Sequence, residues 1–168
     1  MQKLTIDSSR ESILNAALMG VEFEFYSNLD LEATQKSLAT LLDRKIRLED
    51  KAHSDFQPSA EEFKMEPDMS GGKGLIELVT GPIPYRNARI MVIKMLNWIS
   101  KNGYTNDRAS IHINLSFDKK YLEDRDTVLK MNVLKFILEF DEAQVYKLFP
   151  NREKSAYAKS VKWVMPKW

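Results

Sequence analysis

Glutamate, histidine and asparagine side chains recur at two-residue spacing in separate parts of this 168-residue chain. Glu22 and Glu24 are separated by one apolar residue, and Glu77 stands among apolar neighbours. His112 and Asn114 repeat the spacing. In a β-strand, residues two apart point the same way. Several carboxylates on one face repel one another unless a cation lies between them, and an oxygen-rich set with one imidazole suits Mg²⁺ or Mn²⁺.

Any one of these pairs is also compatible with an ordinary solvated strand face. The metal interpretation depends on potential ligand residues recurring in three strands, so the secondary-structure elements that carry them must be identified. Four segments alternate apolar and polar residues with the period of a strand, and we expect one largely antiparallel sheet. They cover residues 20–26, 62–68, 74–80 and 109–117.

Three of these predicted strands allow more detailed predictions. The sequence Ser70-Gly71-Gly72-Lys73-Gly74 is a turn, so the second and third strands are predicted to form a hairpin. In the fourth strand, the odd-numbered residues from Ile111 to Phe117 are predicted to point into the core, which leaves His112 and Asn114 on the opposite, wet face.

Four helices are predicted. Ser8 and Glu11 form a capping-box pattern for a helix over about 9–18, which Gly20 would break. Asp30 would begin a second helix that runs to about Leu48. The other two cover about 85–101, with Ala88, Met91, Val92, Met95, Leu96 and Ile99 as its apolar stripe, and about 123–147. Helices on one side of such a sheet make residues 1–168 a single α+β domain.

Composition excludes several classes of function. Lys plus Arg (25) balances Asp plus Glu (24), so no overall field favours nucleic acid or an anionic membrane. The chain has no cysteine, which excludes disulfides, thiolate zinc sites and cysteine nucleophiles and fits a reducing compartment. No apolar run approaches the roughly 20 residues of a membrane span. We expect a cytoplasmic or virion-associated protein that binds neither nucleic acid nor membrane.

The segment Gly20-Val21-Glu22-Phe23-Glu24 resembles the G-x-E-x-E opening strand of the amidoligases. This family belongs to the carboxylate–amine ligase superfamily, with glutamine synthetase and glutamate–cysteine ligase. Further segments match the family's patterns in the same order. They are Asp68-Met69-Ser70 with Glu77, Thr80 and Pro82 for D-x-S … E-x-x-S/T-x-P, Ile111-His112-Ile113-Asn114 for H-x-H/N, and more loosely Arg152 and Tyr157 for a later R…Y stretch.

The resemblance implies a glutamine-synthetase-like catalytic fold and an ATP-dependent ligase. Such an enzyme activates a carboxylate as an acyl phosphate, and an amine attacks it to give an amide. The resemblance implies that Glu22, Glu24 and Glu77 ligate Mg²⁺ or Mn²⁺ bridging the nucleotide phosphates. His112 would be a metal ligand or a phosphate contact, and Asn114 would orient the ligands.

Three more residues receive roles from the same resemblance. Asp68 and Ser70 would shape the site near the metals or the substrate. Arg152 would contact phosphate through its planar guanidinium, or it is a surface arginine at a helix end. The substrates would be a small-molecule or peptide carboxylate and an amine.

Members of this family are usually longer and carry a closing strand, often with an E-x-R motif. The chain reaches Trp168 without such a strand, so we expect only the N-terminal part of the family fold, with the site open on one side. Three explanations stay open. The chain is part of a longer protein, a partner chain completes the site, or the fold is reused without catalysis, for example in a structural component of a phage particle.

Overall fold

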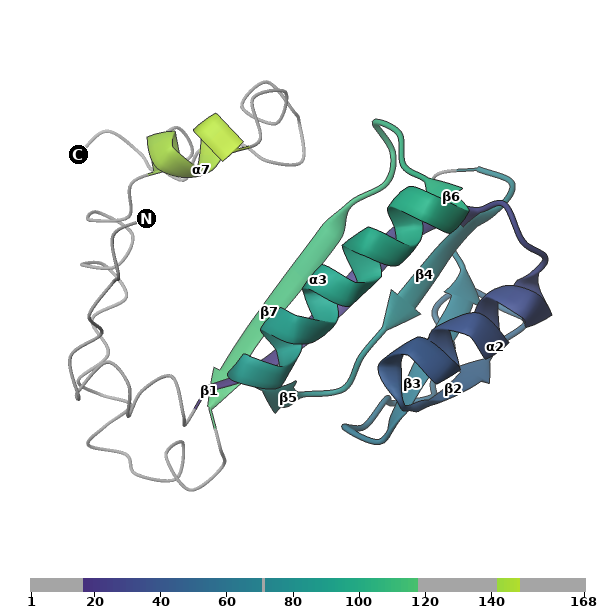
Figure 1. The fold of residues 1–168 in the computed structure, drawn as a ribbon, viewed down its shortest axis with the longest axis horizontal. Coiled ribbons are helices and arrows are strands. Elements are labelled where there is room, and N and C mark those ends of the chain that lie inside the picture. Colours follow the sequence, from purple (N-terminus) through teal and green to yellow (C-terminus); the bar gives the residue numbers. More distant parts are fainter. Residues whose placement is uncertain (1–16, 71, 118–141, 149–168) are drawn as a thin grey trace. The chain divides into compact units, whose positions relative to one another are not determined.

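The computed structural model describes residues 17–70, 72–117 and 142–148 (Figure 1). Contacts divide the chain into two compact units, Met1–Lys119 and Lys120–Trp168. In the second unit the described element is the helix α7 (Glu142–Leu148), where Lys147 donates a hydrogen bond to Gln144 at 3.5 Å. The sheet and the candidate site belong to the first unit.

The eleven-residue strand β1 (Ala17–Ser27) is the axis of a seven-stranded sheet. The strand β4 (Leu75–Val79) pairs with one edge of β1, and β7 (Ile111–Phe117) pairs with the other, both antiparallel. Two-residue strands extend the pairing at the ends of β1. They are β5 (Ile83–Pro84), beside Leu18 and Met19, and β6 (Gly103–Tyr104), beside Tyr26 and Ser27.

Beyond β4 the sheet continues with two more strands. The strand β3 (Glu62–Pro67) forms the predicted antiparallel hairpin with β4. The strand β2 (Lys45–Leu48) pairs with β3 in the parallel direction. The sheet is therefore mixed but largely antiparallel, and the predicted α+β class is confirmed.

Both helices of the first unit, α2 (Leu31–Leu42) and α3 (Tyr85–Asn102), lie on the same side of the sheet (Figure 1). On that side Val21, Phe23 and Phe25 are 0% exposed, and the Phe25 ring meets the Trp98 ring of α3 edge-on at 5.8 Å. Because strand residues alternate between faces, the even-numbered residues of β1 lie on the face away from the helices. Among the described helices, none has the length and apolar character that a membrane span requires.

The helix predicted over about 85–101 is confirmed as α3. It begins directly after Pro84, as the preference of proline for helix starts predicts. Four residues of its predicted apolar stripe are buried, Val92 is partly buried, and Leu96 is 46% exposed. The helix ends at Gly103, where a Cβ atom would collide with the carbonyl oxygen of Tyr26.

Two helix predictions differ from the structure at their ends. The helix over about 9–18 is contradicted at Ala17 and Leu18, which belong to β1, as does Gly20; residues 9–16 lie outside the described ranges. The helix predicted to reach Leu48 ends at Leu42, and β2 follows. At both ends, strand pairing with distant segments outweighs a local helix signal.

The fourth predicted strand is confirmed as β7, but the burial of its apolar face is not. Register places Ile111, Ile113 and Leu115 beside the buried side of β1, as predicted. They are nevertheless 42%, 54% and 68% exposed, because α3 packs over β1 rather than over β7. The predicted helix over about 123–147 lies outside the described residues except where it overlaps α7.

The cap of α2 gives a stability prediction. Asp30 Oδ1 accepts a hydrogen bond from the backbone N–H of Ala33 at 2.7 Å, as the sequence predicted for a helix start. Asp30→Ala should lower the free energy of unfolding by about 1 kcal/mol, because it leaves that N–H unsatisfied. Asp30→Asn retains an acceptor and should be close to the native protein. Urea denaturation measures both, and equal midpoints for Asp30→Ala and the native chain would contradict the capping role.

Candidate metal centre

Three carboxylates lie in one row across three strands, on the sheet face away from α2 and α3. Glu77 of β4 is directly opposite Glu24 of β1 and directly opposite Glu66 of β3. Residues that face each other across paired strands project from the same side of the sheet. No role was predicted for Glu66 from the sequence. The alternation of β3 nevertheless puts Glu66 on the face opposite to Phe63 and Met65, which lie on the helix side.

Glu66 is 2% exposed and is fully engaged by its neighbours. Its Oε1 lies 3.0 Å from Lys64 Nζ and accepts from the His53 N–H at 3.2 Å, and its Oε2 accepts from the Ser54 N–H at 3.1 Å. Burial acts to raise the pKa of Glu66, but the hydrogen bonds from Lys64 and Ser54 outweigh it and hold that pKa below its usual value. Glu66 thus ties the loop after β2 to the sheet.

Glu24, at the other end of the row, is 7% exposed and anchors the start of β7. Its Oε2 accepts from the Ser110 N–H at 2.9 Å, and its own backbone N–H donates to the Ser110 carbonyl at 3.0 Å. Its Oε1 lies 3.8 Å from His112 Nε2. Glu24 therefore fixes where β7 begins, and with it the position of His112.

Glu77, in the middle, has carboxylates on both sides. Burial raises its pKa to about 7, with added effects from the charges of Glu22 and Glu66 and then of Asp68 and Glu24. A carboxylate surrounded in this way is stabilised either by a proton or by a cation.

A group of three potential ligands forms around Glu77. One donor atom each from Glu22, Glu77 and His112 lie within 4.8 Å of one another. Register explains the approach of two of them, because Glu22 and His112 are opposite residues of β1 and β7. Their side chains meet, with His112 Nδ1 2.9 Å from Glu22 Oε2, and Asn114 Nδ2 donates to Glu22 Oε1 at 3.0 Å.

The three donor groups fit a hard divalent cation. Around Mg²⁺, bonds of about 2.1 Å place opposite ligands about 4.2 Å apart, so only small side-chain movements would close the present spacing. The side chains of Glu22 and His112 are 28% and 56% exposed, which leaves room for water or phosphate oxygens as further ligands. Glu24 lies outside this group of three, as does Asp68.

Asp68 and Ser70 lie together at the end of β3. The backbone N–H and the hydroxyl of Ser70 donate to the two carboxylate oxygens of Asp68, both at 2.8 Å. Together they build the entry to the hairpin turn, from which the charge of Asp68 reaches Glu77. Arg152 lies outside the described residues.

Thr80 of the E-x-x-T pattern directly follows β4 and has a positioning role in the sheet. Its Oγ1 accepts from the Val21 N–H at 2.9 Å and donates to the Gly81 carbonyl at 3.0 Å. A Cβ atom at Gly81 would collide with the backbone of Ser59, so only glycine fits there. This part of the motif holds β4 in register with β1 and so aligns Glu77 with the carboxylates of β1.

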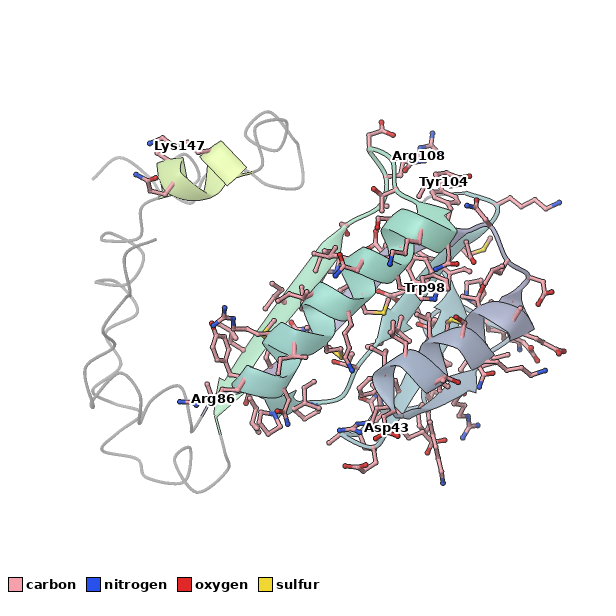
Figure 2. All side chains as sticks on the ribbon, viewed as in Figure 1. Asp43, Arg86, Trp98, Tyr104, Arg108 and Lys147 are labelled. Atoms are coloured by element: carbon pink, nitrogen blue, oxygen red, sulfur yellow. The ribbon has the colours of Figure 1, made fainter. Side chains whose placement is uncertain are left out.

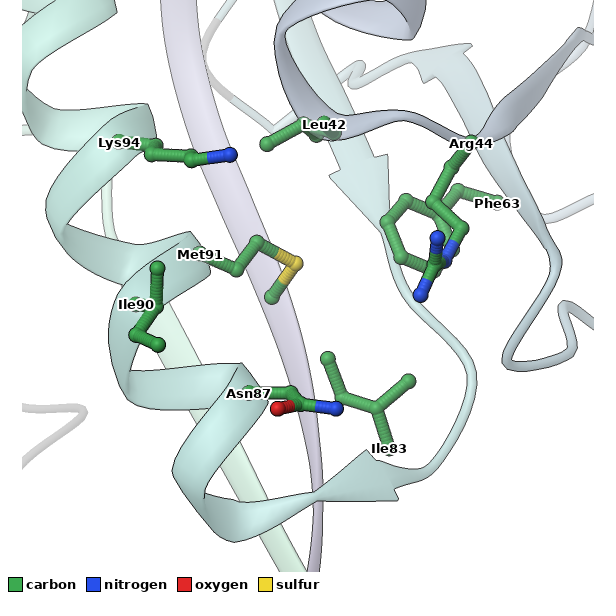
Figure 3. Close-up of a pocket in the computed structure, with 8 residues that line it drawn as sticks. All are labelled: Leu42, Arg44, Phe63, Ile83, Asn87, Ile90, Met91 and Lys94. Atoms are coloured by element: carbon green, nitrogen blue, oxygen red, sulfur yellow. The ribbon is translucent and has the colours of Figure 1, made fainter.

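A pocket on the helix side of the sheet is separate from this centre (Figure 3). It lies between α2 and α3, and its cationic groups hold nearby backbone: Lys94 Nζ donates to the Leu41 carbonyl at 3.2 Å, and Arg44 Nε to the Ala60 carbonyl at 2.9 Å. Its lining residues are Leu42, Arg44, Phe63, Ile83, Asn87, Ile90, Met91 and Lys94. These contacts make it a gap between helices rather than a part of the carboxylate site.

Residues 15–163 match a family described as "Putative amidoligase enzyme". The chain belongs to the amidoligase family. The matched region contains all three members of the candidate metal group and most of the chain, so the resemblance drawn from the motifs is confirmed at the level of the family. Comparisons with curated proteins and with solved structures gave no match.

The raised pKa of Glu77 gives a prediction for the protein without metal. The pKa of about 7 exceeds the ordinary value of 4.5, so ionising Glu77 costs the folded state free energy. The stability that protonated Glu77 contributes is therefore fully present below pH 4.5 and is lost as the pH rises through about 7. Glu77→Gln removes this loss. In the presence of a chelator, the melting temperature of Glu77→Gln minus that of the native chain should therefore increase between about pH 5 and about pH 8.

The control is Glu61→Gln, which replaces an exposed carboxylate just before β3. Its melting temperature should differ from that of the native chain by the same amount at both pH values. A difference for Glu77→Gln that is equally independent of pH would show that Glu77 ionises as an ordinary surface carboxylate does.

Proposed function

We propose that this protein is an ATP-dependent carboxylate–amine ligase whose divalent metal is held by Glu22, Glu77 and His112. The observation that carries the proposal is the approach of these three donor groups to within 4.8 Å, in a chain that belongs to the amidoligase family. The ion would be Mg²⁺ or Mn²⁺, because two carboxylates and one imidazole suit those cations.

The proposed reaction has two steps. A carboxylate oxygen of the first substrate attacks the γ-phosphorus of ATP, and ADP leaves. The amine nitrogen of the second substrate then attacks the acyl carbon of the resulting acyl phosphate, inorganic phosphate leaves, the nitrogen loses a proton to water, and an amide bond remains. A bound divalent ion supplies charge neutralisation for the phosphate oxygens and holds them in line for transfer.

The protein's own groups would prepare the site for this reaction. Asn114 and His112 hold the two oxygens of Glu22, which fixes the direction of that carboxylate. Glu24 would serve as a further ligand or as the anchor of the strand that carries His112. Outside this group, Asp68 and Ser70 would help to shape the site near the metal or the substrate, and Arg152 would contact phosphate.

Metal binding is the first test. Isothermal titration calorimetry with Mn²⁺ and with Mg²⁺ should show binding to the native chain, and Glu22→Gln and Glu77→Gln should abolish it, since each removes a ligand charge. Asn114→Ala should weaken binding by about tenfold, because it frees the Glu22 carboxylate to rotate. Glu61→Gln is the matched control and should bind as the native chain does. Equal binding by all four variants would place the ion elsewhere.

Catalysis is the second test. The full chain with ATP, Mg²⁺ or Mn²⁺, a panel of carboxylic acids and hydroxylamine as a small amine should form hydroxamates together with ADP. Glu77→Gln should lower this rate by at least about a hundredfold, since electrostatic positioning supplies most of the acceleration in phosphoryl transfer. A chain that binds the metal but neither binds nor hydrolyses ATP, with or without the acids, would favour the non-catalytic structural role.

A further inference from the structure

The face of the sheet away from α2 and α3 changes character along β1. Glu22 and Glu24 lie near its middle, and Tyr26 follows at the same two-residue spacing on the same face. Tyr26 is paired in register with Tyr104 of β6, and the two rings stack with centroids 4.9 Å apart and planes 6° apart. The face therefore runs from acidic to aromatic within one strand, while Phe25 packs against the helix side.

The aromatic end has a rigid base and an accessible top. Tyr26 is 8% exposed and Tyr104 is 54% exposed, so one side of the Tyr104 ring rests on Tyr26 and the remainder is open. Leu75 of β4, which lies opposite Tyr26 on the other edge of β1, is 1% exposed. The turn approaches closely at Gly74, where a Cβ atom would lie 3.9 Å from Tyr26 Cδ1. Tyr104 thus presents a supported, flat apolar surface.

The distance between the acidic and the aromatic parts of β1 matches the length of a nucleoside triphosphate. Tyr26 lies four residues beyond Glu22, which is about 13 Å at the rise of a β-strand. That is the scale of a nucleoside triphosphate laid out from its base to its terminal phosphate. Arg108 lies at the aromatic end with Tyr104 (Figure 2), and its Nη1 would be 3.7 Å from a Cβ atom at Gly72 of the hairpin turn.

We propose that the stacked pair Tyr26–Tyr104 is the platform for the nucleobase of the ATP substrate. The base would stack on the open side of Tyr104, and the phosphates would extend along β1 toward Glu22 and Glu77. The inference rests on the proposed ligase function and adds a binding site to it. Stacking is available to every base, so the platform supplies affinity for the ring without selecting one purine over another.

The test compares two ligands that share the phosphates but not the ring. Calorimetry in Mg²⁺ measures ATP and inorganic tripolyphosphate binding to the native chain, Tyr104→Ala and Tyr104→Phe. Tyr104→Ala should weaken ATP binding by between about fivefold and about a hundredfold, the usual effect of removing one stacked aromatic ring, and leave tripolyphosphate binding unchanged. Tyr104→Phe retains the ring and should bind ATP as the native chain does. GTP should follow ATP in all three proteins.

Each of the other possible outcomes rules out the platform, alone or together with the ligase function. If the native chain binds both ligands and Tyr104→Ala binds ATP equally well, the platform is wrong and the metal-phosphate site stands. If Tyr104→Ala weakens both ligands equally, Tyr104 supports the sheet only, and the platform is again wrong. If the native chain binds neither ligand, the ligase function and the platform fail together. Circular dichroism of the variants confirms that the sheet is intact before the comparison.

Discussion

Repulsion within one row of carboxylates is the constraint on which the rest of this structure depends. Like charges directly opposite one another destabilise a sheet, and here Glu24, Glu77 and Glu66 are neighbours across three strands. The outer two are relieved from outside the row, by the Ser110 N–H and by the Lys64 ammonium. The same contacts attach the start of β7 and the loop after β2 to the sheet. The contacts that offset the repulsion therefore also fix the segments at the two edges of the site.

The carboxylate in the middle of the row keeps its unfavourable surroundings, which are the physical basis of the proposed metal site. Glu77 has a pKa near neutrality in the folded protein, because burial and the adjacent charges oppose its ionisation. A cation held between Glu77, Glu22 and His112 would relieve that cost. A site built in this way exchanges stability of the empty protein for affinity toward a charged ligand, which is a common arrangement at functional sites.

The helix side of the sheet supplies the rigidity that such a site needs. Val21, Phe23 and Phe25 alternate with the glutamates of β1 and are completely buried, so the backbone that carries the carboxylates is packed from below. Functional groups on well-packed strands hold their geometry better than groups on loops. The packing does not extend to β7, where Ile113 and Leu115 stay exposed among the described residues although they face the helix side.

The sequence by itself determined which residues of a strand share a face and where α2 begins, because strand alternation and the helix cap at Asp30 are local properties. It therefore predicted the common side of Glu22 and Glu24. Tertiary structure alone decided which strands are neighbours and in what register. That placed Glu66 beside Glu77, ended α2 at Leu42, and left Ile113 uncovered. The physical reason is that pairing joins segments far apart in the chain, and a period of two residues carries no information about the partner strand.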